Sequence, residues 1–95
     1  MNQNGAILRF IDNNQYKHMK KVEIFSTPTC VYCKHAKEYF AENKVEYIEH
    51  NVANDMEQRK VMIEKSGQLG VPVIIIDGEV TVGFEKEKIA GQLGL

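Results

Sequence analysis

Residues 22–33 read VEIFSTPTCVYC, and this short stretch decides the fold. Its beginning, Val22–Ser26, is rich in apolar and β-branched side chains and predicts a β-strand. The residues that follow, 31–42, place small and apolar side chains at helical spacing and predict a helix. The two cysteines of the chain, Cys30 and Cys33, therefore lie where a strand passes into a helix.

This position gives the two thiols different chemistry. The first sulfur, on Cys30, lies at a helix N-terminus, where unpaired N–H groups and the helix dipole favour an anion. The anion favoured here is a thiolate, which is the nucleophilic form of cysteine. The second sulfur, on Cys33, follows one turn later and is close enough to form a small disulfide. The pair predicts a redox couple rather than a structural cross-link.

Composition limits the class of protein. The chain has 95 residues, of which 43% are hydrophobic and 26% charged, and its net charge is −1. These values predict one small globular domain and no nucleic-acid partner. No apolar run approaches the length of a membrane span, and residues 1–18 lack a signal-peptide pattern. We therefore expect a cytoplasmic protein without membrane contact, in a reducing compartment where a C-x-x-C pair is catalytic or binds metal.

Residues 1–18 differ from the rest by their many Asn and Gln side chains. Two interpretations stay open: a mobile leader, or a short added helix carrying Ile7, Leu8, Phe10 and Ile11 on one face. We expect an N-terminal extension over residues 1–18 and one domain over residues 19–95.

The remaining pattern alternates strands and helices. We expect strands at Val22–Ser26, Val45–His50, Val73–Ile76 and Glu79–Val82, and helices at residues 31–42, 55–66 and 84–93. The order is βαβ followed by αββα, which predicts an α/β fold with a four-stranded mixed sheet flanked by three helices. The Asp77-Gly78 pair predicts a tight hairpin between the last two strands.

Three motifs follow in order along these elements: the strand leading into TCVYC (residues 29–33), then GVPV (residues 70–73), then Gly83-Phe84 before the last helix. Over about residues 20–95 the chain resembles the glutaredoxin branch of the thioredoxin-like superfamily. The resemblance implies a thioredoxin-like fold of the glutaredoxin type.

The cysteines are the candidate catalytic residues. We expect Cys30 to attack a disulfide and the more buried Cys33 to resolve the mixed disulfide that forms. A zinc half-site is the alternative, but zinc needs four ligands, and His18, His35 and His50 show no ligand spacing around a second cysteine pair. We therefore predict no metal site and no bound cofactor.

The resemblance also implies binding residues. It places a cis bond at Val71-Pro72, with the Val71 backbone receiving substrate like an added strand, although a proline there could simply start the strand. It places Tyr32 at the rim of the thiol site. Arg59 and Gln68 match positions that approach the glycine carboxylate of glutathione, but either could be a surface residue.

The remaining positions of the implied pocket are Thr27, Gly83, Phe84 and Glu85. Two further residues near the thiols, His35 and Lys37, are expected to be solvated on the helix surface.

Three positions depart from the glutaredoxin pattern. Val31 replaces the usual proline between the cysteines, Thr27 replaces a lysine, and Lys86 stands where an acid usually meets the glutathione amino group. The chain is also similar to the glutaredoxin-like hydrogen donors of ribonucleotide reductase, which thioredoxin reductase recharges. However, Val82 and Glu85-Lys86 depart from that pattern too, so the chain lies between the two subfamilies.

The sequence thus predicts a dithiol oxidoreductase that reduces protein or small-molecule disulfides as a monomer. Glutathione or another thiol reductant would be the co-substrate, and a flavoprotein reductase is a possible partner. Two alternatives stay open: iron–sulfur cluster binding or transfer by a glutaredoxin-like dimer, and a non-catalytic adaptor, against which the intact cysteine pair argues.

Overall fold

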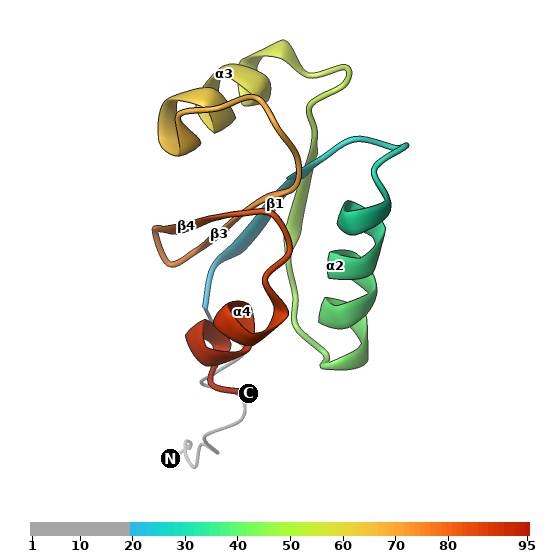
Figure 1. The fold of residues 1–95 in the computed structure, drawn as a ribbon, viewed down its shortest axis with the longest axis vertical. Coiled ribbons are helices and arrows are strands. Elements are labelled where there is room, and N and C mark those ends of the chain that lie inside the picture. Colours follow the sequence, from blue (N-terminus) through green and yellow to red (C-terminus); the bar gives the residue numbers. More distant parts are fainter. Residues whose placement is uncertain (1–19) are drawn as a thin grey trace, which may run out of the picture.

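The structure, a computed structural model, describes residues 20–95, and the predictions for residues 1–18 lie outside that range. Strands and helices follow one another in the predicted order (Figure 1). They are β1 (Val22–Ser26), α2 (Val31–Glu42), β2 (Ile48–Asn51), α3 (Met56–Ser66), β3 (Val73–Ile76), β4 (Glu79–Val82) and α4 (Lys86–Leu93).

The four strands form one mixed sheet in the order β2-β1-β3-β4. β1 runs parallel to β2, because α2 carries the chain back to the same end of the sheet before β2 begins. β1 and β3 are antiparallel, as are β3 and β4, which a hairpin joins. The hairpin residues Asp77 and Gly78 have φ angles of 50° and 88°, which suit a two-residue turn of the predicted kind.

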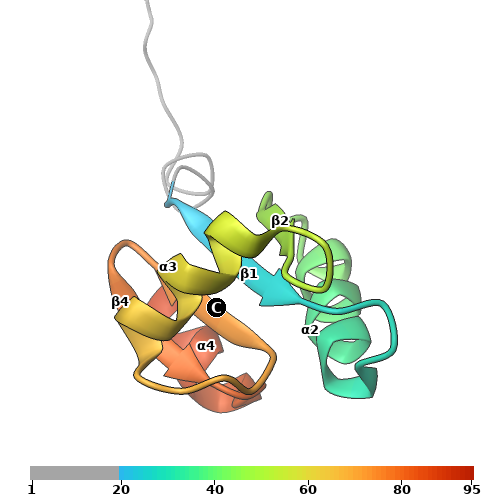
Figure 2. The ribbon, with the colours of Figure 1, turned by 90° about the horizontal axis from the view of Figure 1, so that it is seen from above.

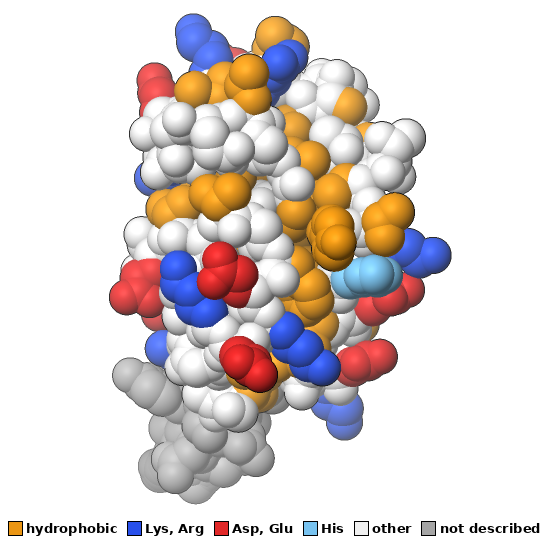
Figure 3. Space-filling view, in the orientation of Figure 1, with side chains coloured by type: hydrophobic (Ala, Val, Ile, Leu, Met, Phe, Trp, Pro, Cys, Tyr) orange, Lys and Arg blue, Asp and Glu red, His pale blue; other side chains and the backbone are white. Residues whose placement is uncertain are grey.

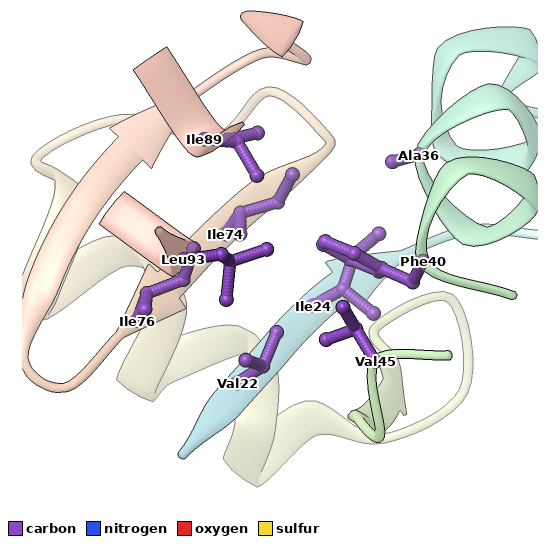
Figure 4. Packing of buried hydrophobic residues seen from close by; sticks show 9 residues of the cluster. All are labelled: Val22, Ile24, Ala36, Phe40, Val45, Ile74, Ile76, Ile89 and Leu93. Carbon is purple, nitrogen blue, oxygen red and sulfur yellow. The ribbon is translucent and has the colours of Figure 1, made fainter. Parts of the chain in front are cut away.

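Helices cover both faces of this sheet (Figure 2). α2 and α4 pack on one face, and α3 packs on the other. The first face buries the cluster shown in Figure 4: Val22, Ile24, Ala36, Phe40, Val45, Ile74, Ile76, Ile89 and Leu93. The second face buries Phe25, Val52, Met62, Val73 and Ile75. All four residues of β3 are buried, which confirms the prediction of a central strand covered on both sides.

The second strand is shorter and later than predicted. It spans Ile48–Asn51, whereas the sequence predicted Val45–His50. Val45 is buried in the core and Tyr47 packs against it, so both side chains point inward as a strand pattern requires. However, pairing with β1 begins only at Ile48, opposite Glu23. The alternating apolar pattern at Val45 and Tyr47 therefore correctly indicated buried side chains, but these residues do not pair with β1.

Two helices also begin later than predicted. α3 starts at Met56, because Asp55 is its N-cap and accepts a hydrogen bond from the Gln58 amide at 3.1 Å. α4 starts at Lys86 instead of residue 84. Gly83 has a φ of 87°, which no helix residue adopts, and Phe84 packs against the core before the helix begins.

Candidate active site

Cys30 is the N-cap of α2. Its backbone is extended, and its sulfur accepts a hydrogen bond from the Cys33 amide at 3.1 Å. Its carbonyl accepts from the Lys34 amide at 3.2 Å, which begins the helix. A sulfur in this position meets the unpaired N–H groups and the positive end of the helix dipole. The structure therefore places a partly exposed sulfur at the helix end, where it accepts an amide hydrogen bond.

Cys33 is in the opposite environment. Its side chain is fully buried, with 0% exposed surface. Burial, reinforced by the hydrogen bond with Cys30, raises the pKa of the Cys33 thiol to about 12. The site thus pairs an accessible sulfur at a helix end with a buried sulfur that keeps its proton near neutrality.

The strand register brings the predicted binding segments to the same end of the sheet. Phe25 pairs with Val73 in antiparallel register, so the loop that follows β1, with Thr27, and the loop that precedes β3, with Val71, lie at the same end of the sheet. The Cys30 amide donates to the Thr27 carbonyl at 3.3 Å, which places the first thiol at this end as well.

The same end of the sheet includes Gly83, whose amide donates to the Pro72 carbonyl at 2.8 Å. The Val71-Pro72 bond is cis, as the resemblance implied. The positions Thr27, Val71, Pro72 and Gly83, which are scattered in the sequence, therefore lie at the end of the sheet where α2 begins.

Val71 offers unused backbone groups. Within residues 20–95 its N–H and carbonyl have no hydrogen-bond partner. By contrast, the side chain of Gln68 is already engaged: its oxygen accepts from the Gly70 amide at 2.6 Å, and its nitrogen donates to the Gly70 carbonyl at 3.0 Å. Gln68 thus braces the loop before Val71, and the glutathione contact predicted for it would require these bonds to break.

Aromatic and aliphatic side chains flank the thiols on the surface. Val31 and Tyr32, which lie between the cysteines, are 61% and 65% exposed. The Tyr32 ring meets His35 edge-on, with centroids 6.0 Å apart. Figure 3 shows hydrophobic side chains continuing along this face between α2 and the C-terminal part of the domain. The structure therefore places Tyr32 at the surface, as expected for a rim residue.

The segment before α4 forms another border of this face. The Phe84 ring packs on Tyr39 at 5.7 Å, and the Lys86 ammonium lies 5.4 Å from the centroid of the same Tyr39 ring. Together with His35, Glu38 and Glu42, these three residues line a shallow groove between α2 and α4. Glu85 is exposed as the N-cap of α4, and its carboxylate makes no capping bond.

Arg59 lies on the exposed side of α3. Its guanidinium forms no ion pair or hydrogen bond with any residue between 20 and 95, so it is available to a ligand, and its predicted role stays a prediction.

The sequence did not predict the network around Glu49. Its carboxylate accepts hydrogen bonds from the buried Ser26 hydroxyl and from the Lys37 ammonium, each at 2.8 Å. Lys37 was expected to be solvated, but its side chain is only 29% exposed because it lies against β2. A polar residue at the end of an otherwise apolar strand was the one signal of this network in the sequence.

No group of three or more His, Cys, Asp or Glu side chains within residues 20–95 is arranged to hold a metal ion. In the same range, none of the helices has the length and apolar character needed to cross a bilayer.

Comparisons with known proteins agree with this geometry. Residues 22–81 match the family model described as Glutaredoxin. The chain belongs to the glutaredoxin family. It is 48% identical over 68 residues to an uncharacterized glutaredoxin-like 8.6 kDa protein in the rubredoxin operon of Clostridium pasteurianum, which covers 72% of this chain and 91% of that protein. It is 36% identical over 61 residues to glutaredoxin 3 of Escherichia coli, covering 64% of this chain and 74% of the relative.

Among solved structures, the glutaredoxin of Methanosarcina mazei superposes with a TM-score of 0.70 at 26% identity, covering 79% of each chain. The glutaredoxin family and this superposition confirm the predicted thioredoxin-like fold. A thiol redox function follows in general terms, because the glutaredoxin motif retains both cysteines, Cys30 and Cys33.

Proposed function

We propose that this glutaredoxin reduces disulfides of proteins or small molecules through a cycle of its own two thiols. The Cys30 thiolate attacks one sulfur of the substrate disulfide and forms a mixed disulfide, and the other substrate sulfur leaves as a thiolate that takes a proton from water. Cys33 then attacks the Cys30 sulfur, and its proton passes to the departing substrate sulfur. A disulfide forms between the two cysteines, and the second half of the substrate is released as a thiol.

One observation carries this proposal: the two sulfurs differ in exposure and in hydrogen bonding while lying one helical turn apart. Cys30 is partly exposed and accepts an amide hydrogen bond, whereas Cys33 is buried and protonated. This division suits a first attack on an external disulfide and a second attack inside the protein. The unpaired backbone of Val71 supports docking of an extended substrate segment beside Cys30.

The reductant that restores the dithiol is a further part of the proposal. Glutathione carries two carboxylates and one ammonium, so a strong site needs a cation and an acid in the right places. Thr27 supplies no cation, and Lys86 brings a positive charge to the beginning of α4. We therefore favour a flavoprotein reductase of the thioredoxin reductase type over glutathione. Turnover by such a reductant also fits a cytoplasmic protein.

A coupled assay tests both parts. The oxidised protein is supplied with NADPH and thioredoxin reductase in one series, and with glutathione and glutathione reductase in the other, with a protein disulfide as substrate. We expect faster turnover in the first series. Equal or faster turnover with glutathione would overturn the choice of reductant, and no turnover in either series would overturn the proposed reaction.

A further inference from the structure

Three polar side chains from three different elements meet at one carboxylate oxygen. Oε2 of Glu49, on β2, accepts from Oγ of Ser26 at the end of β1 and from Nζ of Lys37 on α2. Ser26 is fully buried, and the side chains of Lys37 and Glu49 are 29% and 39% exposed. The ammonium of Lys37 is therefore held in one place by a carboxylate that is itself fixed from the core side.

This fixed ammonium lies on the Cys33 side of α2. Lys37 follows Cys33 by four residues, one turn along the same side of the helix, and its charge is the smallest of the influences on the pKa of the Cys33 thiol, which it lowers. From the sheet, Ser26 directly precedes Thr27, whose backbone hydrogen-bonds the Cys33 thiol. The charged and titratable groups that face this region are Cys30 and Lys37 on α2, Glu49 on β2, and Tyr47 just before β2.

We infer that Lys37, anchored by Glu49 and Ser26, is a positioning residue for the second step of the cycle, in which its ammonium stabilises the thiolate that forms at Cys33. The inference rests on the proposed dithiol reaction. It concerns the resolving thiol only, and it assigns no role to Lys37 in the first attack by Cys30.

The chemistry of the step supports charge stabilisation over proton transfer. Resolution requires the Cys33 S–H bond to break, a new bond to form between the two cysteine sulfurs, and the bond from Cys30 to the substrate sulfur to break. The pKa of Lys37 is raised, mainly by its hydrogen bond to Glu49, so this group is already protonated and cannot accept the proton. The pKa of Glu49 is lowered, mainly by Lys37, which makes its carboxylate a weak base. Neither group takes the Cys33 proton, which passes to the departing substrate sulfur, and the charge that develops on the Cys33 sulfur lies one helical turn from the Lys37 ammonium, which is paired with Glu49.

A single-turnover reaction with the aromatic disulfide DTNB separates the two steps. Attack by Cys30 releases a first coloured thiolate, and resolution by Cys33 releases a second, so stopped-flow absorbance records both. We expect Lys37→Gln to slow the second release about three- to tenfold, from the loss of one unit charge near a developing thiolate in a partly screened site. The first release should change much less. Lys37→Arg should restore the second release, because it keeps the charge.

Lys34→Gln is the matched control, because it removes one positive charge from an exposed position of the same helix. The rate of the second release should also increase more steeply with rising pH in Lys37→Gln than in the unmodified protein. A mere loss of packing would not produce this change in pH dependence. Equal slowing of both releases, or an unchanged second release, would overturn the inference. Failure of the proposed function looks different: both releases would occur normally, while protein disulfides would not be reduced.

Discussion

The two cysteines are chemically distinct because of a few contacts each. Cys30 caps α2, and its sulfur accepts a hydrogen bond from the Cys33 amide, whereas the Cys33 side chain has no access to solvent. We therefore expect any difference in their reactivity to come from their position relative to one helix end. It does not require a basic residue beside the first thiol.

This asymmetry predicts selective labelling. With limiting iodoacetamide near neutral pH, Cys30 should be alkylated first, because Cys33 is buried and its pKa is raised to about 12. Cys30→Ser should abolish disulfide reduction, and Cys33→Ser should accumulate mixed disulfides with protein substrates. Peptide mapping by mass spectrometry measures the labelling; equal modification of both cysteines would contradict the assignment.

The Glu49 network predicts a pH-dependent contribution to stability. Its folded pKa is lowered, so the stabilisation is present above the unfolded pKa and is lost as the pH falls through the folded value. The raised pKa of Lys37 means that its contribution is lost only at alkaline pH, as the pH rises through its folded value.

Glu49→Gln should therefore lower the free energy of unfolding at neutral pH by about 0.5–1 kcal/mol, a small value because both side chains are partly exposed to screening solvent. The difference from the unmodified protein should shrink in acid. Urea denaturation at several pH values measures this, with Glu46→Gln as an exposed control. A difference that is the same at neutral and acidic pH would argue against an electrostatic origin.

At the scale of elements, the site is assembled from ends of strands and helices. The end of β1, the start of β3, the end of β4 and the start of α2 meet at one end of the sheet, and the residues between them form loops. The binding residues are carried by these loops, while the strands fix their positions. The three departures from the glutaredoxin pattern, Thr27, Val31 and Lys86, lie in the loop after β1 and at the starts of α2 and α4.

Two of these departures, Thr27 and Lys86, predict how glutathione use can be improved. The double substitution Thr27→Lys with Lys86→Asp supplies a cation for one end of glutathione and an acid for the other. An acid at the start of α4 is also compatible with the helix dipole. We expect roughly five- to thirtyfold better use of glutathione, from two partly exposed charge contacts.

Steady-state kinetics with glutathione and glutathione reductase provide the measurement. Thr29→Lys with Lys88→Asp makes the same changes of charge at exposed positions and serves as the control. An equal gain in both double variants would mean that overall charge, and not this pocket, limits glutathione use.

At the scale of the whole molecule, a separate hydrophobic cluster is buried on each face of the small sheet. Phe40 belongs to the larger layer, is fully buried, and contacts both Tyr39 and Tyr47 through its ring. A domain of this size has little stability to spare, since folded proteins are typically stable by only about 5–15 kcal/mol.

Phe40→Ala should therefore lower the free energy of unfolding by about 3–5 kcal/mol, because it removes a large ring and leaves a cavity. Thermal denaturation followed by circular dichroism measures the loss. Glu42→Ala, at an exposed position on the same helix, should change stability little. If both variants lost a comparable amount of stability, the loss would come from a change in helix formation and not from the cavity in the core.

Local patterns predicted most of this architecture. The run Val73–Ile76 indicated a covered central strand, Asp77-Gly78 indicated its hairpin, and the cysteine spacing indicated the helix end. Errors arose where side chains pack like a strand without pairing, as at Val45 and Tyr47. The contact between Lys37 and Glu49 could not be predicted, because it depends on the register of β2 against β1 and on how α2 lies across them.

The reciprocal bonds between Lys21 and Asp77 have a consequence for how this domain can be joined to others. The Lys21 amide donates to the Asp77 carboxylate, and the Asp77 amide donates to the Lys21 carbonyl, so the chain enters β1 at the end of the sheet far from the thiols. α4 also ends there, and Leu95 lies at that same pole of the molecule (Figure 1). A reporter fused after Leu95 should thus leave the cysteines accessible, which suits the domain to use as a module in redox sensors.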